Sequence, residues 1–240
     1  MPLRTASHAR TNTSLTAAAE RRLLVWIAAR LPPWITSDRL SSLGLAAMAA
    51  AGLSFAALRW TPWAAAGVVV SLAANWFGDS LDGTVARVRR QERPRFGYYV
   101  DHVIDLAGTS LLMTGVACSG LMHPTLALAV LGAYLLVSAE SYLTAHAAGI
   151  FRMSFLGFGP TELRLVLAIG AIKCAASPWI RLFGGVPTLR LFDIGGGVAA
   201  LGLLAAFTAA AIGNTRALHR EEPLPRTRGA VAAAADVRVA

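Results

Sequence analysis

The sequence contains almost no lysine, little cysteine and few charges. Lys173 is the single lysine among 240 residues, and Cys118 and Cys174 are the two cysteines. Both cysteines fall in or beside apolar segments and lack the spacing of metal ligands, so neither a disulfide framework nor a cysteine metal site is expected. Charged residues make up 15% of the chain, whereas a soluble domain carries about 25%. The composition therefore excludes an ordinary soluble domain.

Apolar sequence takes the place of the missing charge. Hydrophobic residues make up 55% of the chain, and the mean hydropathy is +0.55. Such values are typical of a polytopic membrane protein rather than of a domain with one buried core. We predict an all-α fold with about six transmembrane helices, over residues 40–58, 63–86, 97–119, 124–146, 163–176 and 194–212.

Residues 14–34 predict an N-terminal amphipathic helix that lies on the membrane surface. Its apolar residues recur at helical spacing, but Arg21, Arg22 and Arg30 make it too charged to cross a bilayer. No secretory signal peptide is recognisable, because the first residues are polar. The remaining chain divides into a disordered N-terminus, a transmembrane catalytic domain and a disordered cytoplasmic tail, over residues 1–13, 35–213 and 214–240.

The basic residues predict the orientation in the membrane. The net charge is +9, which on its own is also compatible with nucleic-acid binding. Most of the arginines, however, lie between apolar segments, and the positive-inside rule explains that distribution without a nucleic-acid partner. We expect both termini in the cytoplasm, because 18 of the 22 Lys and Arg residues then lie on the cytoplasmic side. The other four fall in outer connections, namely Arg59, Lys173, Arg181 and Arg190.

Four carboxylates interrupt the apolar sequence where the second and third predicted spans meet. Asp79 and Asp82 are three positions apart, and Asp101 and Asp105 are four positions apart, so each pair shares one helix face. A charge near the bilayer centre costs about 2.5 to 3.5 kcal/mol, which makes intramembrane acids candidates for a functional site. The short polar link at 88–96 predicts that the two helices are antiparallel neighbours whose acidic faces meet.

Four clustered carboxylates require a counter-charge. Because the available ligands are oxygen atoms, we expect two divalent cations, Mg²⁺ or Mn²⁺, at Asp79, Asp82, Asp101 and Asp105. Two such cations would suit an in-line displacement at phosphorus. The alternative interpretations are an Asp–Arg charge network at a helix end and an acidic ion relay. A relay would distribute its acids along a pathway, whereas these acids gather at one membrane surface.

The constellation resembles the signature of the CDP-alcohol phosphatidyltransferase family. That signature reads D-x-x-D-G-x-x-A-R followed by G-x-x-x-D-x-x-x-D. The chain matches every fixed position, with Asp79, Asp82, Gly83, Ala86, Arg87, Gly97, Asp101 and Asp105. One departure precedes the first span, where family members often carry Pro-Asn-x-x-Thr near the nucleotide. Here Asp38 replaces the amide with a charge, and the alternative interpretation of Asp38 is a helix cap.

The resemblance implies a reaction and roles for these residues. An acceptor hydroxyl would attack a CDP-alcohol such as CDP-diacylglycerol and release CMP, in phospholipid biosynthesis at a cell membrane. Asp105 would act as the catalytic base besides binding metal, and the nucleotide would be bound by Asp82, Gly83, Ala86 and Arg87. The alternatives are an amino-alcohol phosphotransferase with a CDP-amino alcohol donor, and a membrane protein without catalytic activity. We also expect a homodimer.

The acceptor is left open by the sequence. Arginine forks suit phosphate, so Arg89, Arg90, Arg152 and Arg164 are candidate acceptor-binding residues, and glycerol 3-phosphate or an inositol phosphate is a candidate acceptor. The loop arginines equally suit a patch that sets topology and binds lipid headgroups. Glu140, near the same membrane surface, is a further candidate for the acceptor pocket, with a structural acid as its alternative.

Overall fold

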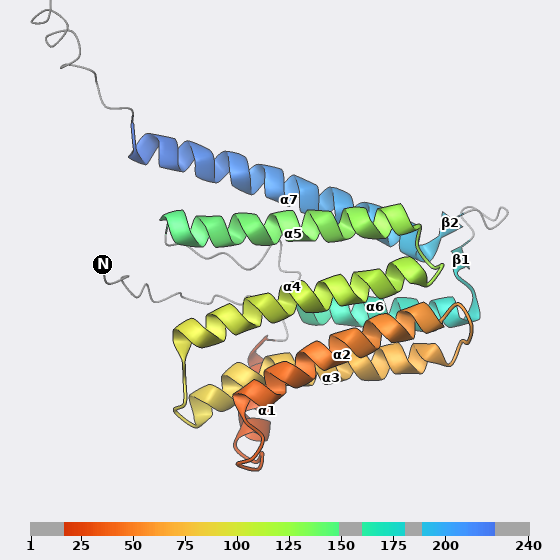
Figure 1. Cartoon of the computed structure of the whole chain (residues 1–240), viewed down its shortest axis with the longest axis horizontal. Coiled ribbons are helices and arrows are strands. Elements are labelled where there is room, and N and C mark those ends of the chain that lie inside the picture. Colours follow the sequence, from red (N-terminus) through yellow and green to blue (C-terminus); the bar gives the residue numbers. More distant parts are fainter. Residues whose placement is uncertain (1–16, 149–159, 181–188, 224–240) are drawn as a thin grey trace, which may run out of the picture.

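The computed structural model describes residues 17–148, 160–180 and 189–223, and this part of the chain is almost entirely helical (Figure 1). Its helices are α1 Ala17–Ala28, α2 Ser37–Ala57, α3 Ala64–Val88, α4 Pro94–Cys118, α5 Pro124–Ala148, α6 Pro160–Ala176 and α7 Leu191–Glu221. A short antiparallel pair, β1 Trp179–Ile180 with β2 Leu189–Arg190, precedes α7. The predicted all-α class is confirmed, with this pair as a minor addition.

Four helices are long and apolar enough to cross a membrane, namely α2, α3, α5 and α7. The chain is therefore an integral membrane protein. Helices α4 and α6 run alongside them (Figure 1), but α6 has 17 residues and α4 carries Asp101 and Asp105 in its first half. Six spans thus remain a prediction.

Helix α2 lies between the two helices that carry the acids. It packs against both α3 and α4, which make few direct contacts with each other. On one side, a Cβ atom at Gly78 would lie 2.6 Å from the Leu40 carbonyl oxygen; on the other, one at Gly115 would collide with the backbone of Gly52. Along most of their length α3 and α4 therefore pack against α2 instead of against each other as expected, and glycines let the backbone of α2 approach both.

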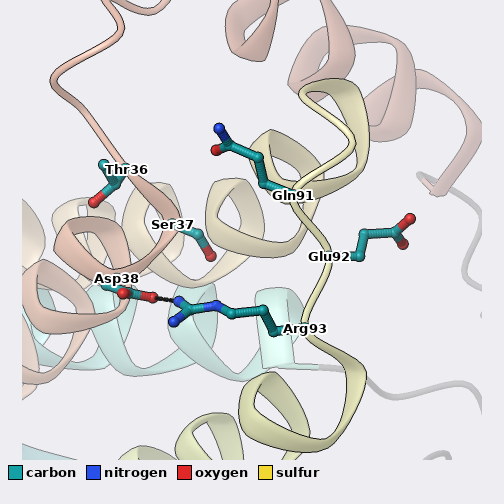
Figure 2. Close-up of a pocket in the computed structure, with 6 residues that line it drawn as sticks. All are labelled: Thr36, Ser37, Asp38, Gln91, Glu92 and Arg93. Carbon is teal, nitrogen blue, oxygen red and sulfur yellow. Dashed lines mark hydrogen bonds and ion pairs between the residues drawn. The ribbon is translucent and has the colours of Figure 1, made fainter.

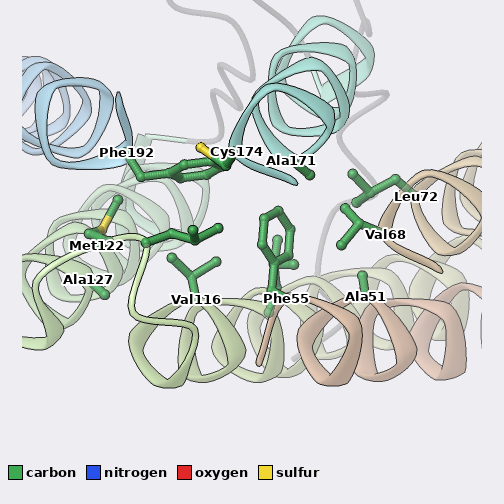
Figure 3. Packing of buried hydrophobic residues seen from close by; sticks show 12 residues of the cluster. Ala51, Phe55, Val68, Leu72, Val116, Met122, Ala127, Ala171, Cys174 and Phe192 are labelled. Carbon is green, nitrogen blue, oxygen red and sulfur yellow. The ribbon is translucent and has the colours of Figure 1, made fainter. Parts of the chain in front are cut away.

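The main apolar core holds the opposite end of the bundle together. Phe55 of α2 and Phe192 of α7 meet edge to face, with ring centroids 5.7 Å apart. Around them lie Val68 and Val116, both fully buried, and residues of α5 and α6 (Figure 3). These contacts join the C-terminal end of α2 to the N-terminal end of α3. Because Asp79 to Asp105 lie at the other end of α3 and α4, the core fixes the helices without filling the acidic region.

A smaller cluster fixes α1 against the outside of α3. Leu24 and Ala28 of α1 are buried with Leu81 and Val85 of α3. The exposed face of α1 is also apolar, since Leu23, Val25 and Trp26 are exposed by 47%, 44% and 55%. A helix with one face on the bundle and a second apolar face outside it fits a position at the membrane boundary.

Helix α7 is longer than the sequence indicates. It continues to Glu221, whereas we expected the ordered domain to end at residue 213. The Asn214 side chain donates to Glu140 Oε1 at 2.6 Å and to Thr144 Oγ1 at 2.9 Å, which ties this part of α7 to α5. These contacts keep the chain helical beyond the apolar run. The predicted disordered N-terminus at 1–13 and the last residues of the predicted tail lie outside the described residues.

The contact between Gly52 and Gly115 can be tested by a single methyl group. We expect Gly115→Ala to lower the free energy of unfolding by about 1–3 kcal/mol, because the new Cβ would meet backbone atoms that cannot rotate away. Thermal unfolding in detergent measures the change. Gly132→Ala is the matched control, since a Cβ there meets nothing within 4 Å. Equal midpoints for the two variants would contradict the close helix crossing.

Candidate active site

The four carboxylates lie toward one end of the bundle, in the C-terminal half of α3 and the N-terminal half of α4. All four are partly buried. Electrostatic interactions link Asp82 to both Asp79 and Asp101, so charges from the two helices influence one another although α2 separates most of their length. The connection 89–93 joins the helices at this end. The acids therefore share a region because of a short loop rather than a continuous helix interface.

Asp82 is held by hydrogen bonds from α2 and from its own helix. Ser41 Oγ lies 2.6 Å from Asp82 Oδ2, and the Gly83 backbone N–H donates to the other carboxylate oxygen. The same Ser41 hydroxyl lies 3.2 Å from the Ser37 carbonyl oxygen. Ser41 thus connects the first turn of α2 to the acidic site.

Asp79 is paired with Arg164 of α6. Arg164 Nη2 donates to Asp79 Oδ2 at 2.5 Å, and Arg164 Nε donates to Asn75 Oδ1 at 2.7 Å. The Asn75 side chain is 6% exposed and donates in turn to the Gly44 carbonyl oxygen at 3.0 Å. Sequence reasoning named Arg164 but missed Asn75. A signal was available, because Asn75 precedes Asp79 by four residues and so shares its helix face.

Asp105 lies toward α5. Electrostatic interactions link it to Tyr134 and Tyr142, and Tyr134 interacts with Asp79 as well. The two tyrosines were not predicted as site residues, because neither belongs to a motif in the sequence. Tyr134 therefore interacts electrostatically both with Asp105 of α4 and with Asp79 of α3.

The donor set has the right chemistry for a hard divalent cation, since carboxylate oxygens are preferred ligands of Mg²⁺ and Mn²⁺. In the described part of the chain, however, no group of three acidic, histidine or cysteine side chains has converged enough to hold a metal. Asp79 is neutralised by Arg164, and Asp82 bonds to Ser41. A cation that bound here would replace Arg164 and Ser41 as the partners of these two carboxylates.

The residues expected at the nucleotide differ in their surroundings. A Cβ atom at Gly83 would approach only the Arg87 side chain, at 3.3 Å from Nη1, so one side of α3 is open there. Ala86 is partly buried. Arg87 is exposed, and its Nη2 donates to Thr84 Oγ1 at 3.1 Å. Their part in nucleotide binding remains a prediction.

The candidate acceptor residues do not form one group. The Arg89 guanidinium donates to four backbone carbonyls, at distances of 2.7–3.4 Å, in the α1–α2 connection 31–35. Glu140 Oε1 accepts from Thr144 and Asn214, as in its structural interpretation. Arg90 is exposed where α3 ends, with a left-handed φ of 55°. Arg152 lies outside the described residues. Among the described candidates, Arg164 reaches the acids.

A pocket of about 420 Å³ opens between the start of α2 and the α3–α4 connection (Figure 2). Its lining residues are Thr36, Ser37, Asp38, Gln91, Glu92 and Arg93. Thr36 caps α2 by accepting from the Arg39 backbone N–H. Asp38 is therefore not the cap, and its carboxylate forms an ion pair with Arg93 across the pocket.

The sequence pattern that describes CDP-alcohol phosphatidyltransferases matches residues 30–211, most of the chain. The chain belongs to this family. The match covers α2 to α6 and most of α7, and it includes all four aspartates. The phosphatidyltransferase is therefore an enzyme of the phosphotransferase class, and the resemblance seen in the motif is confirmed.

Solved structures support the fold of the phosphatidyltransferase. A phosphatidylinositol phosphate synthase from Mycobacterium tuberculosis, with CDP-DAG bound, is similar with a TM-score of 0.51 and 21% sequence identity. The similarity covers 82% of this chain and 92% of that one. No curated protein sequence matches. At 21% identity this similarity shows that the two proteins share a fold.

The Asn75–Arg164 contact predicts measurable coupling in the phosphatidyltransferase. We expect Asn75→Ala to lower the free energy of unfolding by about 1–3 kcal/mol, because it removes one buried and one partly buried hydrogen bond. Combined with Arg164→Ala, the loss should fall short of the sum by about 0.5–3 kcal/mol, as expected for side chains in one network. Thermal unfolding measures both values. Thr114→Ala, which removes an exposed hydroxyl bonded to its own helix, is the control, and additive losses would contradict the coupling.

Proposed function

We propose that the enzyme transfers a phosphatidyl group from CDP-diacylglycerol to a phosphorylated acceptor alcohol and releases CMP. The acceptor oxygen forms a bond to the phosphorus next to diacylglycerol, and the bond from that phosphorus to CMP breaks. The observation that carries the proposal is the gathering of Asp79, Asp82 and Asp101 at one end of the bundle, with Arg164 beside them. The family membership supplies the reaction class.

The donor is proposed as a CDP-lipid because a family enzyme of the same fold was solved with CDP-DAG. Gly83 and Ala86 leave space along α3 for the flat cytosine ring, and Arg87 lies within reach of a phosphate from the same helix. The acyl chains would lie in the bilayer beside the bundle. A reaction at the mouth of membrane helices lets the lipid remain in the membrane while CMP leaves into water.

Asp79, Asp82 and Asp101 are proposed to hold divalent cations, Mg²⁺ or Mn²⁺, with a contribution from Asp105. Such cations neutralise the diphosphate and the departing CMP. Arg164 contributes a positive charge at the same place. Its pairing with Asp79 shows that this carboxylate accepts a cationic partner, and when the carboxylate turns to another cation the guanidinium becomes available to an anion.

Asp105 is proposed as the base that takes the acceptor's proton. It is the fourth acid and lies one turn further along α4 than Asp101. Tyr134 and Tyr142 interact with it electrostatically, so Asp105 lies beside the hydroxyl groups that α5 contributes to the site.

The acceptor is proposed to carry a phosphate, such as glycerol 3-phosphate or an inositol phosphate. Arg164 is the observation that favours it, because a guanidinium at the acids can bind phosphate with two parallel hydrogen bonds. Arg89 is used by the α1–α2 connection instead. We propose further that the acidic end faces the cytoplasm, where the arginine distribution predicts it, and that the enzyme is a homodimer.

An assay of CMP release tests the proposal directly. Purified enzyme in nanodiscs with CDP-diacylglycerol should release CMP when a phosphorylated acceptor and Mg²⁺ or Mn²⁺ are added, and full chelation should abolish the release. Serine and an uncharged amino alcohol are the control acceptors. Equal turnover of these acceptors would contradict the phosphorylated acceptor, and activity after complete chelation would contradict the metal requirement.

Substitutions of Asp79 and Asp105 should affect donor binding and turnover differently. We expect Asp105→Asn to keep most of the CDP-lipid affinity and to lose at least about 100-fold in kcat, since ground-state binding needs no proton transfer. Asp79→Asn should lose affinity as well as turnover, because it removes a ligand for the cation that binds the diphosphate. Donor binding is measured separately from turnover by equilibrium titration. If Asp105→Asn removed donor binding as fully as Asp79→Asn, Asp105 would be a metal ligand instead of a dedicated base.

A further inference from the structure

A second pocket lies on the side of α3 away from the acids. It has a volume of about 230 Å³, and its lining residues are Arg21, Val25, Thr84, Arg87 and Val88. The first two belong to α1 and the others to the last turns of α3. Thr84 follows Asp82 by two residues, so the two side chains point to nearly opposite sides of the helix. The four aspartates are thus not part of the pocket, and Arg87, which borders it, lies between the pocket and the proposed nucleotide site.

The lining has the chemistry of a phosphate site. Two guanidinium groups, one from each helix, border the pocket, and no acidic residue is among the residues that line it. The Thr84 side chain is 5% exposed, and its hydroxyl already accepts from Arg87 Nη2 at 3.1 Å, which orients that guanidinium. By contrast, the pocket at the start of α2 is lined by Asp38 and Glu92 and therefore disfavours an anion.

The surroundings favour a lipid over a free anion. Val25 and Val88 form an apolar border, exposed by 44% and 40%. The neighbouring face of α1 continues with the exposed Leu23 and Trp26, and α3 is a membrane-spanning helix. A ligand with a phosphate at the arginines and acyl chains along these apolar residues would satisfy both parts of the surface. Basic pockets of this kind at membrane helices bind the headgroups of anionic lipids.

We propose that this α1–α3 pocket is a binding site for the phosphate headgroup of an anionic phospholipid. The lipid binds here as a ligand and takes no part in the transfer reaction. It links α1 to the end of α3, five residues after Asp82, and so stabilises the position of the amphipathic helix at the acidic end of the bundle. The inference does not depend on which acceptor the enzyme uses.

Lipid titration followed by native mass spectrometry tests the site. The full chain in detergent is titrated with phosphatidic acid and, separately, with phosphatidylcholine of the same acyl chains. We expect tighter binding of phosphatidic acid, and Arg21→Gln should weaken it about fivefold, the effect of about one arginine near a membrane surface. Arg22→Gln is the matched control, because Arg22 is exposed on the same helix with the same charge but does not line the pocket. It should change the affinity less than about twofold.

Further measurements make the result decisive. Arg21→Lys should retain part of the binding, because it keeps the charge and loses the planar fork, and equal unfolding midpoints show that the variants are folded. Equal weakening by Arg21→Gln and Arg22→Gln would overturn the site in favour of general charge attraction. Displacement of the lipid by inorganic phosphate at equal concentration would overturn a lipid ligand, and displacement by cytidine diphosphate would assign the pocket to the donor site. Failure of CMP release would leave the binding result unaffected.

Discussion

The structure depends on the close approach of α2 to two neighbouring helices at once. Gly44 and Gly78 let it meet α3, and Gly52 and Gly115 let it meet α4, with backbone against backbone on both sides. In a bilayer, where lipid tails are as apolar as leucine, such contacts are a main source of helix association. Because α2 is held between α3 and α4, the acids of these helices meet only where the short connection joins them. The geometry of the site is thus a consequence of helix packing elsewhere.

Electrostatics at the acidic end follow from the same arrangement. Three of the acids have different partners: Asp82 accepts from a hydroxyl of α2, Asp79 accepts from a guanidinium of α6, and Asp105 interacts with tyrosines of α5. Three carboxylates of one motif therefore lie in different surroundings, although their sequence spacing is almost regular.

The arginines show how one residue type serves several purposes near the site. Arg164 reaches the carboxylates, while Arg89 satisfies backbone carbonyls of the α1–α2 connection that a helix end and two prolines leave without helical partners. Arg93 pairs with Asp38 across the first pocket. A cluster of arginines in the sequence therefore does not indicate a single phosphate site. The spatial partners of each guanidinium decide its role.

The sequence by itself determined the membrane class, the helical fold, the family and the four aspartates, because hydropathy and motif spacing are local properties of the chain. It could not determine that α2 separates α3 from α4, that Asn75 orients Arg164, or that Arg89 is occupied by the backbone. These contacts join residues 31 to 89 positions apart, and no local pattern records them. The tertiary structure decided them, because helix packing depends on which glycines of distant segments meet, and that choice places every side chain around the acids.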